Sequence, residues 1–254
     1  MSALLSLARS TLFVLLQGAV TVVFSLVAIL TFPFQPFTRY RIITQWSRIV
    51  VWLARVICGI RYEVIGADHL PREPSIVLSK HQSAWETLVF QCLLPPQVWV
   101  LRRSLLKVPF FGWGLAMMNP IAIDRDAGMR ALKQTLEQGK QRLREGFWII
   151  VFPEGTRVLP GETGKYQIGG AWLAKHTGVP VVPVAHNAGG LWQRNAFMKF
   201  PGTITVSFGK PIDTRNLSAE EINARTRDWI EAEVQRLGDP RAGTPVARVS
   251  TTSP

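Results

Sequence analysis

A histidine and a carboxylate are the first residues in the chain whose types and spacing could do chemistry. His81 directly follows an apolar run, and Glu86 lies five positions further on, within Lys80-His81-Gln82-Ser83-Ala84-Trp85-Glu86-Thr87. Histidine is the side chain best suited to moving a proton near neutral pH. A carboxylate that holds the Nδ1 proton leaves Nε2 free to act as a base. The spacing therefore indicates a general base oriented by an acid.

Glu86 also has a purely structural explanation. Ser83 and Glu86 have the spacing of a capping box, in which a serine and an acid satisfy backbone amides at the start of a helix. A carboxylate has two oxygens, so one residue can cap a helix and orient a histidine. The sequence leaves both roles open.

A possible phosphate site follows the strongest strand-like run, at Phe152-Pro153-Glu154-Gly155-Thr156-Arg157. The residues Pro-Glu-Gly-Thr are ordinary in a turn, and Gly155 permits close approach of the backbone. No turn needs Arg157, whose planar guanidinium fits a phosphate well. The alternative is an arginine on a solvated surface.

Further basic residues follow other strand-like runs. Arg102, Arg103 and Lys107 precede the turn Pro109-Phe110-Phe111-Gly112, and Arg125 follows the short run at 121–123. These cations could converge on one anion, or they could form a solvated basic surface.

The composition narrows the class of partner. The 254 residues include 29 Lys and Arg against 17 Asp and Glu, so the net charge is +12, which favours nucleic acid, anionic lipid or a phosphorylated substrate. A hydrophobic share of 47% excludes disorder throughout the chain. Cys58 and Cys92 are too few for a disulfide framework or a cysteine-based zinc site. The other histidines, His69, His176 and His186, lack metal-ligand spacing, so we expect no metal.

The elements that must position these residues alternate along the chain. Strands are expected at 75–79, 98–101, 121–123, 147–152, 181–185 and 203–208, and helices at 85–94, 110–118, 128–145, 168–176 and 219–236. This order predicts an α/β fold, with a mixed, mostly parallel sheet flanked by helices. Ligands of such sheets bind beyond the carboxyl ends of the strands. His81 and Arg157 both stand at such ends.

The amino-terminal part has a different pattern. Leu12 to Phe34 is nearly all apolar and is long enough to cross a bilayer, and no cleavage site follows it. We expect a retained anchor; a buried helical hairpin is the alternative. More arginines follow this segment than precede it, which predicts that the carboxyl-terminal side lies in the cytoplasm.

A second helix is expected from Arg39 to Ile60. Arg41, Arg48 and Arg55 recur every seven residues, so they share one face. This is typical of an interfacial helix whose arginines meet lipid phosphates, and a core helix with a solvated arginine stripe is the alternative. We thus expect a two-helix membrane-associating part at 1–61, an α/β domain at 62–238 and a disordered tail at 239–254.

Four sequence blocks, in order, resemble the glycerolipid acyltransferases, specifically the bacterial 1-acylglycerol-3-phosphate acyltransferases. They are the His-x4-acid block at 81–86, the basic stretch with Pro-Phe-Phe-Gly at 102–112 and its sequel at 119–125, Phe-Pro-Glu-Gly-Thr-Arg at 152–157, and the valine-proline strand at 179–184. Glu86 stands where the family usually has Asp, Asn119 where it usually has Gly, and Arg102 and Arg103 where Lys is common. No departure removes a required functional group.

The resemblance implies a reaction. His81 would deprotonate the sn-2 hydroxyl of lysophosphatidic acid, which attacks the thioester of acyl-CoA or acyl-carrier protein, while Glu86 orients His81. The implied acceptor site comprises Arg157, Glu154, Gly155, Thr156, Arg103, Lys107 and Arg125. No cofactor is implied, and the expected location is the cytoplasmic face of a bacterial inner membrane, against anionic lipid.

The sequence alone leaves two alternatives to this function open. The same chemistry could act on another lyso-lipid or a lipid-linked acceptor. The chain could also be a non-catalytic, basic membrane scaffold. Nucleic acid is disfavoured as a partner because no RNP, KH or helix-turn-helix pattern is present.

Overall fold

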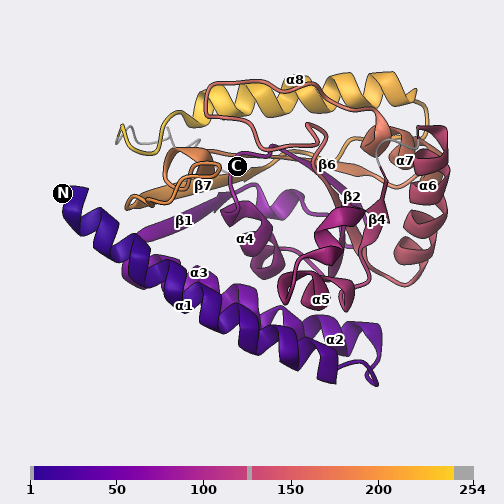
Figure 1. Cartoon of the computed structure of the whole chain (residues 1–254). Coiled ribbons are helices and arrows are strands. Elements are labelled where there is room, and N and C mark those ends of the chain that lie inside the picture. The colour runs from indigo at the N-terminus through magenta and orange to yellow at the C-terminus, as the bar shows by residue number, and fades with distance from the viewer. Residues whose placement is uncertain (1–2, 125–127, 243–254) are drawn as a thin grey trace.

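The structure is a computed structural model that describes residues 3–124 and 128–242 (Figure 1). Arg125 and most of the expected tail, residues 243–254, therefore lie outside the described residues. The strands are β1 Ile60–Ile65, β2 Ile76–Ser79, β3 Gln97–Arg102, β4 Ile121–Ile123, β5 Trp148–Val151, β6 Val181–His186 and β7 Gly202–Phe208. The α-helices are α1 Ala3–Leu30, α2 Pro36–Ile43, α3 Gln45–Cys58, α4 Trp85–Leu93, α5 Phe111–Ala116, α6 Met129–Arg144, α7 Gly169–Thr177 and α8 Ala219–Leu237.

The seven described strands form one sheet in the order β1-β7-β6-β2-β5-β3-β4. Five neighbouring pairs are parallel, and only β6 and β7 run antiparallel. The expected mixed, mostly parallel sheet is thus confirmed. The added strand, β1, lies at the edge beside β7 and begins directly after the left-handed Gly59 (φ 72°) that ends α3.

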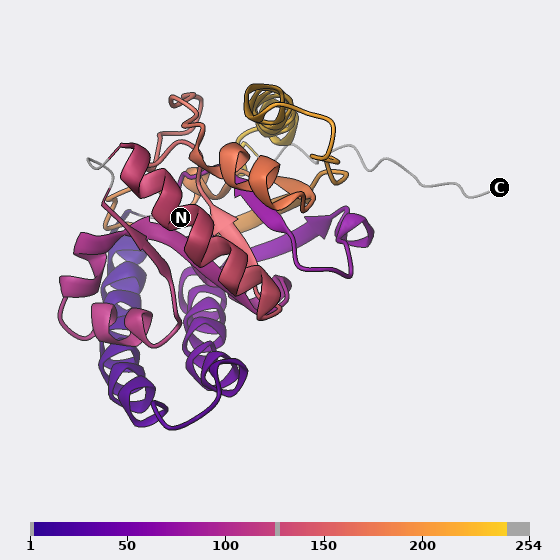
Figure 2. The same cartoon turned by 90° about the vertical axis from the view of Figure 1, so that its right-hand side faces the viewer.

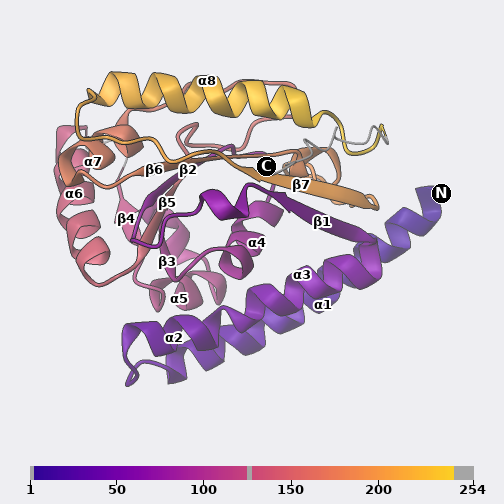
Figure 3. The same cartoon turned by 180° about the vertical axis from the view of Figure 1, so that it is seen from behind.

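Helices cover both faces of this sheet (Figures 1 and 3). Successive side chains of a strand point to opposite faces of the sheet, so alternate residues pack against the helices on opposite sides. Ile76 and Leu78 of β2 join the core beneath α7, while Val77 between them joins the core with Trp85 of α4. The two cores hold β2 and β5 in the middle of the sheet, so the loops that follow these strands start from fixed positions.

The expected helix from 39 to 60 is broken into two. Pro36 starts α2, where a proline fits the first helical turn, and Thr44 separates α2 from α3. The seven-residue spacing still keeps Arg41, Arg48 and Arg55 on an exposed face. The segment ends at Cys58 rather than Ile60, because Ile60 pairs with β7.

Helix α1 lies along the body of the protein, beside α3 and α5 (Figure 2). Its buried residues are Ser6, Ser10, Phe13, Ser25 and Ala28, whereas large apolar side chains such as Leu12, Leu15 and Leu26 are exposed. By length and composition it is the one described helix that could cross a membrane. The amphipathic order of a water-soluble helix is therefore inverted in α1.

Candidate active site

His81 lies just past the carboxyl end of β2, at one end of a cavity. Its ring stacks on Phe152, which follows the neighbouring strand β5, with 3.8 Å between ring centroids and 12° between planes. Its Nδ1 is 2.8 Å from Oε1 of Glu86. Because Nδ1 faces a carboxylate, it carries the ring proton, and Nε2 is left as the acceptor.

Glu86 is fully buried, and one of its two carboxylate oxygens, Oε1, accepts the hydrogen bonds that fix its position. Oε1 accepts from His81 and also from the backbone amides of Gln82 (3.1 Å) and Ser83 (2.9 Å). Oε2 has no hydrogen-bond partner among the described residues. Burial pushes the pKa of Glu86 up, but nearby His186, the bond to His81 and the Ser83 amide together outweigh it, so the pKa lies below its usual value.

The capping box expected of Ser83 and Glu86 forms only in part, because the N-cap of α4 is Ala84 and no side chain caps it. Glu86 accepts the Ser83 amide as a capping box requires, whereas the Ser83 hydroxyl accepts from the Trp85 amide instead of the Glu86 amide. The local turn before α4 thus holds the carboxylate against His81.

Glu154 lies behind the site. Its Oε2 accepts the backbone amide of His81 at 3.1 Å, and its Oε1 accepts from Lys80 Nζ at 2.9 Å and from the Gly164 amide at 3.0 Å. Both Lys80 and Glu154 have fully buried side chains. Glu154 is therefore placed to fix the backbone that carries His81, and it does not line the cavity.

Lys80 extends this network to the last described helix. Its ammonium group donates to Glu231 Oε1 of α8 at 2.8 Å and to the Glu162 carbonyl at 2.9 Å, in addition to Glu154. All three of its protons are therefore bonded. We call Lys80, Glu154 and Glu231 the buried brace.

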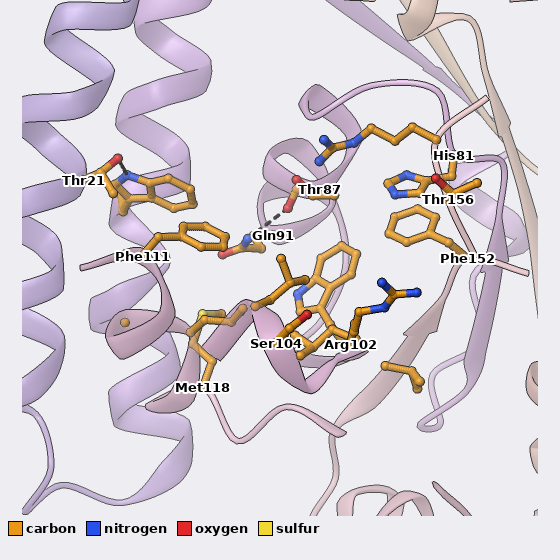
Figure 4. A pocket seen from close by; sticks show the side chains of 18 of the residues that line it. Thr21, His81, Thr87, Gln91, Arg102, Ser104, Phe111, Met118, Phe152 and Thr156 are labelled. Atoms are coloured by element: carbon orange, nitrogen blue, oxygen red, sulfur yellow. Dashed lines mark hydrogen bonds between the residues drawn. The ribbon is translucent and has the colours of Figure 1, made fainter. Parts of the chain in front are cut away.

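The cavity has a volume of about 580 Å³ and runs from His81 to the amino-terminal helices (Figure 4). His81, Phe152 and Thr156 lie at one end, and Thr21 and Phe111 at the other. The lining is mainly apolar and includes Trp99, Leu101, Leu105, Leu115 and Met118. At the far end the Trp46 indole donates to the Thr21 hydroxyl at 3.0 Å. The shape suits a chain-like apolar group whose reactive end meets His81.

Of the basic residues expected near the site, some line the cavity and others are exposed outside it. Gly155, Thr156 and Arg157 line the cavity close to His81, and so does Arg102. Arg103 and Lys107 are exposed on the short 3₁₀ helix η2 (Arg103–Lys107) and are not part of the lining.

Sequence reasoning missed one cation of the lining, Arg194. It lies in the connection between β6 and β7, and its Nη1 donates to the backbone carbonyl of Arg157. The only sequence signal is that it is a basic residue after a strand end. Arg157 Nε itself has no hydrogen-bond partner among the described residues. Among the described residues, the arginines that line the cavity are thus Arg102, Arg157 and Arg194.

The remaining buried histidine, His186, has a structural place. Its Nε2 donates to the Lys80 carbonyl at 3.0 Å, and its Nδ1 accepts from the Ala188 amide at 3.3 Å. Burial lowers the pKa of His186, although the charge of nearby Glu86 opposes this shift. It supports the peptide that leads into His81.

Comparisons with known proteins identify the family and the fold. A family model described as "Acyltransferase" matches residues 61–187. The 1-acyl-sn-glycerol-3-phosphate acyltransferase of Pseudomonas aeruginosa is 44% identical over 234 residues, covering 90% of this chain and 91% of its own. The enzyme of that name from Saccharomyces cerevisiae is 28% identical, covering 77% and 68%.

The solved structures show the same architecture. The crystal structure of the 1-acyl-sn-glycerophosphate (LPA) acyltransferase PlsC from Thermotoga maritima superposes with a TM-score of 0.78, at 21% identity, and covers 93% of this chain and 98% of its own. The fold is thus that of an acyltransferase, with His81 and Glu86 at the end of the sheet beside a largely apolar cavity. The chain belongs to the acyltransferase family and, within it, to the 1-acyl-sn-glycerol-3-phosphate acyltransferases.

Proposed function

We propose that the chain transfers a fatty acyl group from acyl-CoA or acyl-carrier protein to the sn-2 hydroxyl of 1-acylglycerol-3-phosphate, forming phosphatidic acid. The single observation that supports the catalytic roles proposed for His81 and Glu86 is the hydrogen bond between them. Nδ1 of His81 is bonded to a buried carboxylate, while Nε2 has no hydrogen bond to any described residue and lies at the end of a cavity that could hold an acyl chain.

The reaction follows from that geometry. Nε2 of His81 takes the proton of the acceptor hydroxyl as its oxygen forms a bond to the thioester carbonyl carbon. The tetrahedral intermediate then expels the thiolate as its C–S bond breaks, and the imidazolium returns the proton to sulfur. Glu86, ionised because its pKa is lowered, stabilises the imidazolium between these steps. Histidine is regenerated, and the products are the ester and the thiol.

The acceptor phosphate would bind to the guanidinium groups beside His81. Arg157 and Thr156 belong to the cavity lining, and the buried Nε of Arg157 has no hydrogen-bond partner among the described residues. Arg194, held against the Arg157 carbonyl, supplies a second cation. Arginine pairs well with phosphate because its planar donors match two phosphate oxygens.

The membrane contact is proposed for residues 1–61, with the catalytic domain at 62–238 and a tail after it. The inverted order of α1 supports lipid contact, because its large apolar side chains would otherwise face water. Since α1 packs along the body, we propose that it lies in one leaflet with α2 and α3. The exposed Arg41, Arg48 and Arg55 suit anionic headgroups, and the excess of arginine after α1 favours the cytoplasmic face.

The test uses the full chain purified in detergent. Release of thiol is measured with both donors and with three acceptors: lysophosphatidic acid, lysophosphatidylcholine and monoacylglycerol. We expect turnover with lysophosphatidic acid and at least about tenfold less with the other two, because one good charged hydrogen bond is worth that much. Equal use of the three acceptors would reject the phosphate site, and no thiol release by wild type would favour the scaffold.

A further inference from the structure

An apolar surface lies outside the cavity, on the segment from Leu105 to Trp113, which we call the rim. It includes the end of η2 and the first turn of α5. Five large apolar side chains in these nine residues are each 38% to 43% exposed: Leu105, Val108, Phe110, Phe111 and Trp113. Single exposed apolar residues are normal on a protein, but such a cluster marks a contact surface.

The rim lies next to α1. Helix α5 lies directly beside α1 in two perpendicular views (Figures 1 and 2). Gly114 of α5 faces Ser25 and Ala28 of α1, and a Cβ at that position would lie 3.8 Å from the Ala28 side chain and the Ser25 hydroxyl, in ordinary van der Waals contact. Leu26 and Ile29 of α1, on neighbouring turns, are exposed.

The backbone of the rim is strained at Phe110, whose ring is exposed on the surface. Phe110 has φ 62° and ψ −67°, and the Phe111 amide donates to the Pro109 carbonyl at 2.7 Å. This is a three-residue γ-turn of the rare, strained hand, which glycine adopts far more easily than phenylalanine does. The Phe110 ring pairs with Trp113, with centroids 5.0 Å apart. Strain of this kind persists where a side chain has a use.

The rim also separates the cavity from the outside. Leu105 and Phe111 belong to the cavity lining, and both are substantially exposed on the protein surface. Phe110 and Trp113 are exposed but do not line the cavity. A lipid chain that moves from a bilayer into the cavity beside α1 would therefore pass Leu105 and Phe111.

We propose that the rim is a membrane-contacting element in its own right, which inserts Phe110 and Trp113 at the headgroup boundary and admits lipid acceptor to the cavity. The occupant is an anionic bilayer. Exposed Arg103 and Lys107 beside the apolar cluster suit lipid phosphates, and tryptophan and phenylalanine suit the boundary. This inference rests on the proposed function.

Phe110→Gly is the informative variant, because it removes the ring and relieves the strained turn. Turnover is measured with long-chain lysophosphatidic acid in anionic vesicles and with a short-chain, water-soluble lysophosphatidic acid. We expect the apparent KM for the vesicle acceptor to rise about tenfold, which corresponds to partial loss of one buried phenylalanine. The soluble acceptor should be used as by wild type, and Tm should stay the same or rise. Misfolding cannot raise Tm while impairing only one acceptor.

The matched control is Met129→Ser, which removes an exposed apolar side chain at the start of α6, away from the rim. It should change neither acceptor. An unchanged vesicle KM in Phe110→Gly would overturn the proposal. Equal losses with both acceptors would also overturn it, since the rim would then belong to the catalytic site.

A binding measurement separates this inference from the reaction. Anionic vesicles with brominated acyl chains should quench the tryptophan fluorescence of wild type more than that of Trp113→Phe. Equal quenching would reject insertion of the rim, whatever the activity. If quenching differs but wild type turns over neither acceptor, the proposed reaction fails while the membrane contact stands.

Discussion

Replacing Glu86 by glutamine would remove a charge from the site and change its shape very little. The glutamine Oε1 can keep the three bonds that the carboxylate now accepts from His81, Gln82 and Ser83. The amide nitrogen would then take the place of Oε2, which has no partner among the described residues. His81 would keep its tautomer, because its Nδ1 would still face an acceptor.

Two separate costs follow from this geometry. An imidazolium and a carboxylate about 4 Å apart attract by about 4 kcal/mol at an effective dielectric constant of 20, so loss of the charge should slow turnover about 10³-fold. The buried, unpaired amide should cost about 1–3 kcal/mol of stability, which lowers Tm by a few degrees. The variant should therefore fold and be nearly inactive.

Glu86→Asp provides the matched comparison. It keeps the charge, but its carboxylate is one methylene shorter and cannot serve all three donors in a backbone adapted to glutamate. We expect it to retain far more activity than Glu86→Gln. If Glu86 acts only through His81, adding Glu86→Gln to His81→Ala should cost nothing further, whereas His81→Ala alone should cost about 10²–10⁴-fold.

The assay is kcat with a water-soluble acceptor, together with thermal unfolding of each variant. A folded Glu86→Gln protein with more than about a tenth of wild-type kcat would refute the charge argument. Glu86 would then be a helix cap, and His81 would need another partner. Fully additive losses in the double variant would show that Glu86 acts outside the pair.

Three further predictions concern the neighbouring groups. Arg157→Ala should raise the acceptor KM about tenfold or more and leave the donor KM unchanged; a raised donor KM alone would reassign this arginine to the donor. Glu231→Gln should change the free energy of unfolding little, because Lys80 keeps its ion pair with Glu154. Lys80→Met should lower the free energy of unfolding, measured by chemical denaturation, by about 3–5 kcal/mol, because it leaves Glu154 and Glu231 without their shared cation. Equal losses in the two variants would contradict the role given to the buried brace. Because burial lowers the pKa of His186 below 6.5, the unfolded chain binds a proton that the folded chain does not, so stability should fall from pH 7 to pH 5 by up to about 1.4 kcal/mol per unit. His186→Gln should flatten this slope, and an unchanged slope would assign it elsewhere.

Sequence reasoning succeeded where the interactions are local. His81 and Glu86 are five residues apart, so the turn between them already limits where the carboxylate can go. The strands of the central sheet were found for a similar reason, since β2 and β5 are short apolar runs buried on both faces. Strand β1 was missed because it lies at the sheet edge, where only Ile60 is fully buried.

The interactions that sequence could not supply join distant residues. Lys80 meets Glu231 across 151 positions, and only the packing of α8 against β6 brings them together. Arg194 reaches Arg157 across 37 positions. The sequence motif grouped Glu154 with the acceptor site, whereas in the fold its carboxylate faces Lys80 and the His81 amide. A motif shows which residues are neighbours in the chain, not which way they point.

Helix α1 lines the cavity with one face and exposes large apolar side chains on the other. Deleting the helix would therefore affect both the cavity and the proposed membrane contact. Thr21, Phe24 and Ser25 line the cavity, while Leu15 and Leu26 are exposed on the outer surface. Removal of the helix would take away part of the cavity wall as well as the proposed lipid contact, so it could not tell the two apart. A charged side chain on the exposed face would leave the cavity wall intact. The inverted order of α1 fits the proposed membrane contact, because its small and polar residues pack against the rest of the protein and its large apolar residues are exposed.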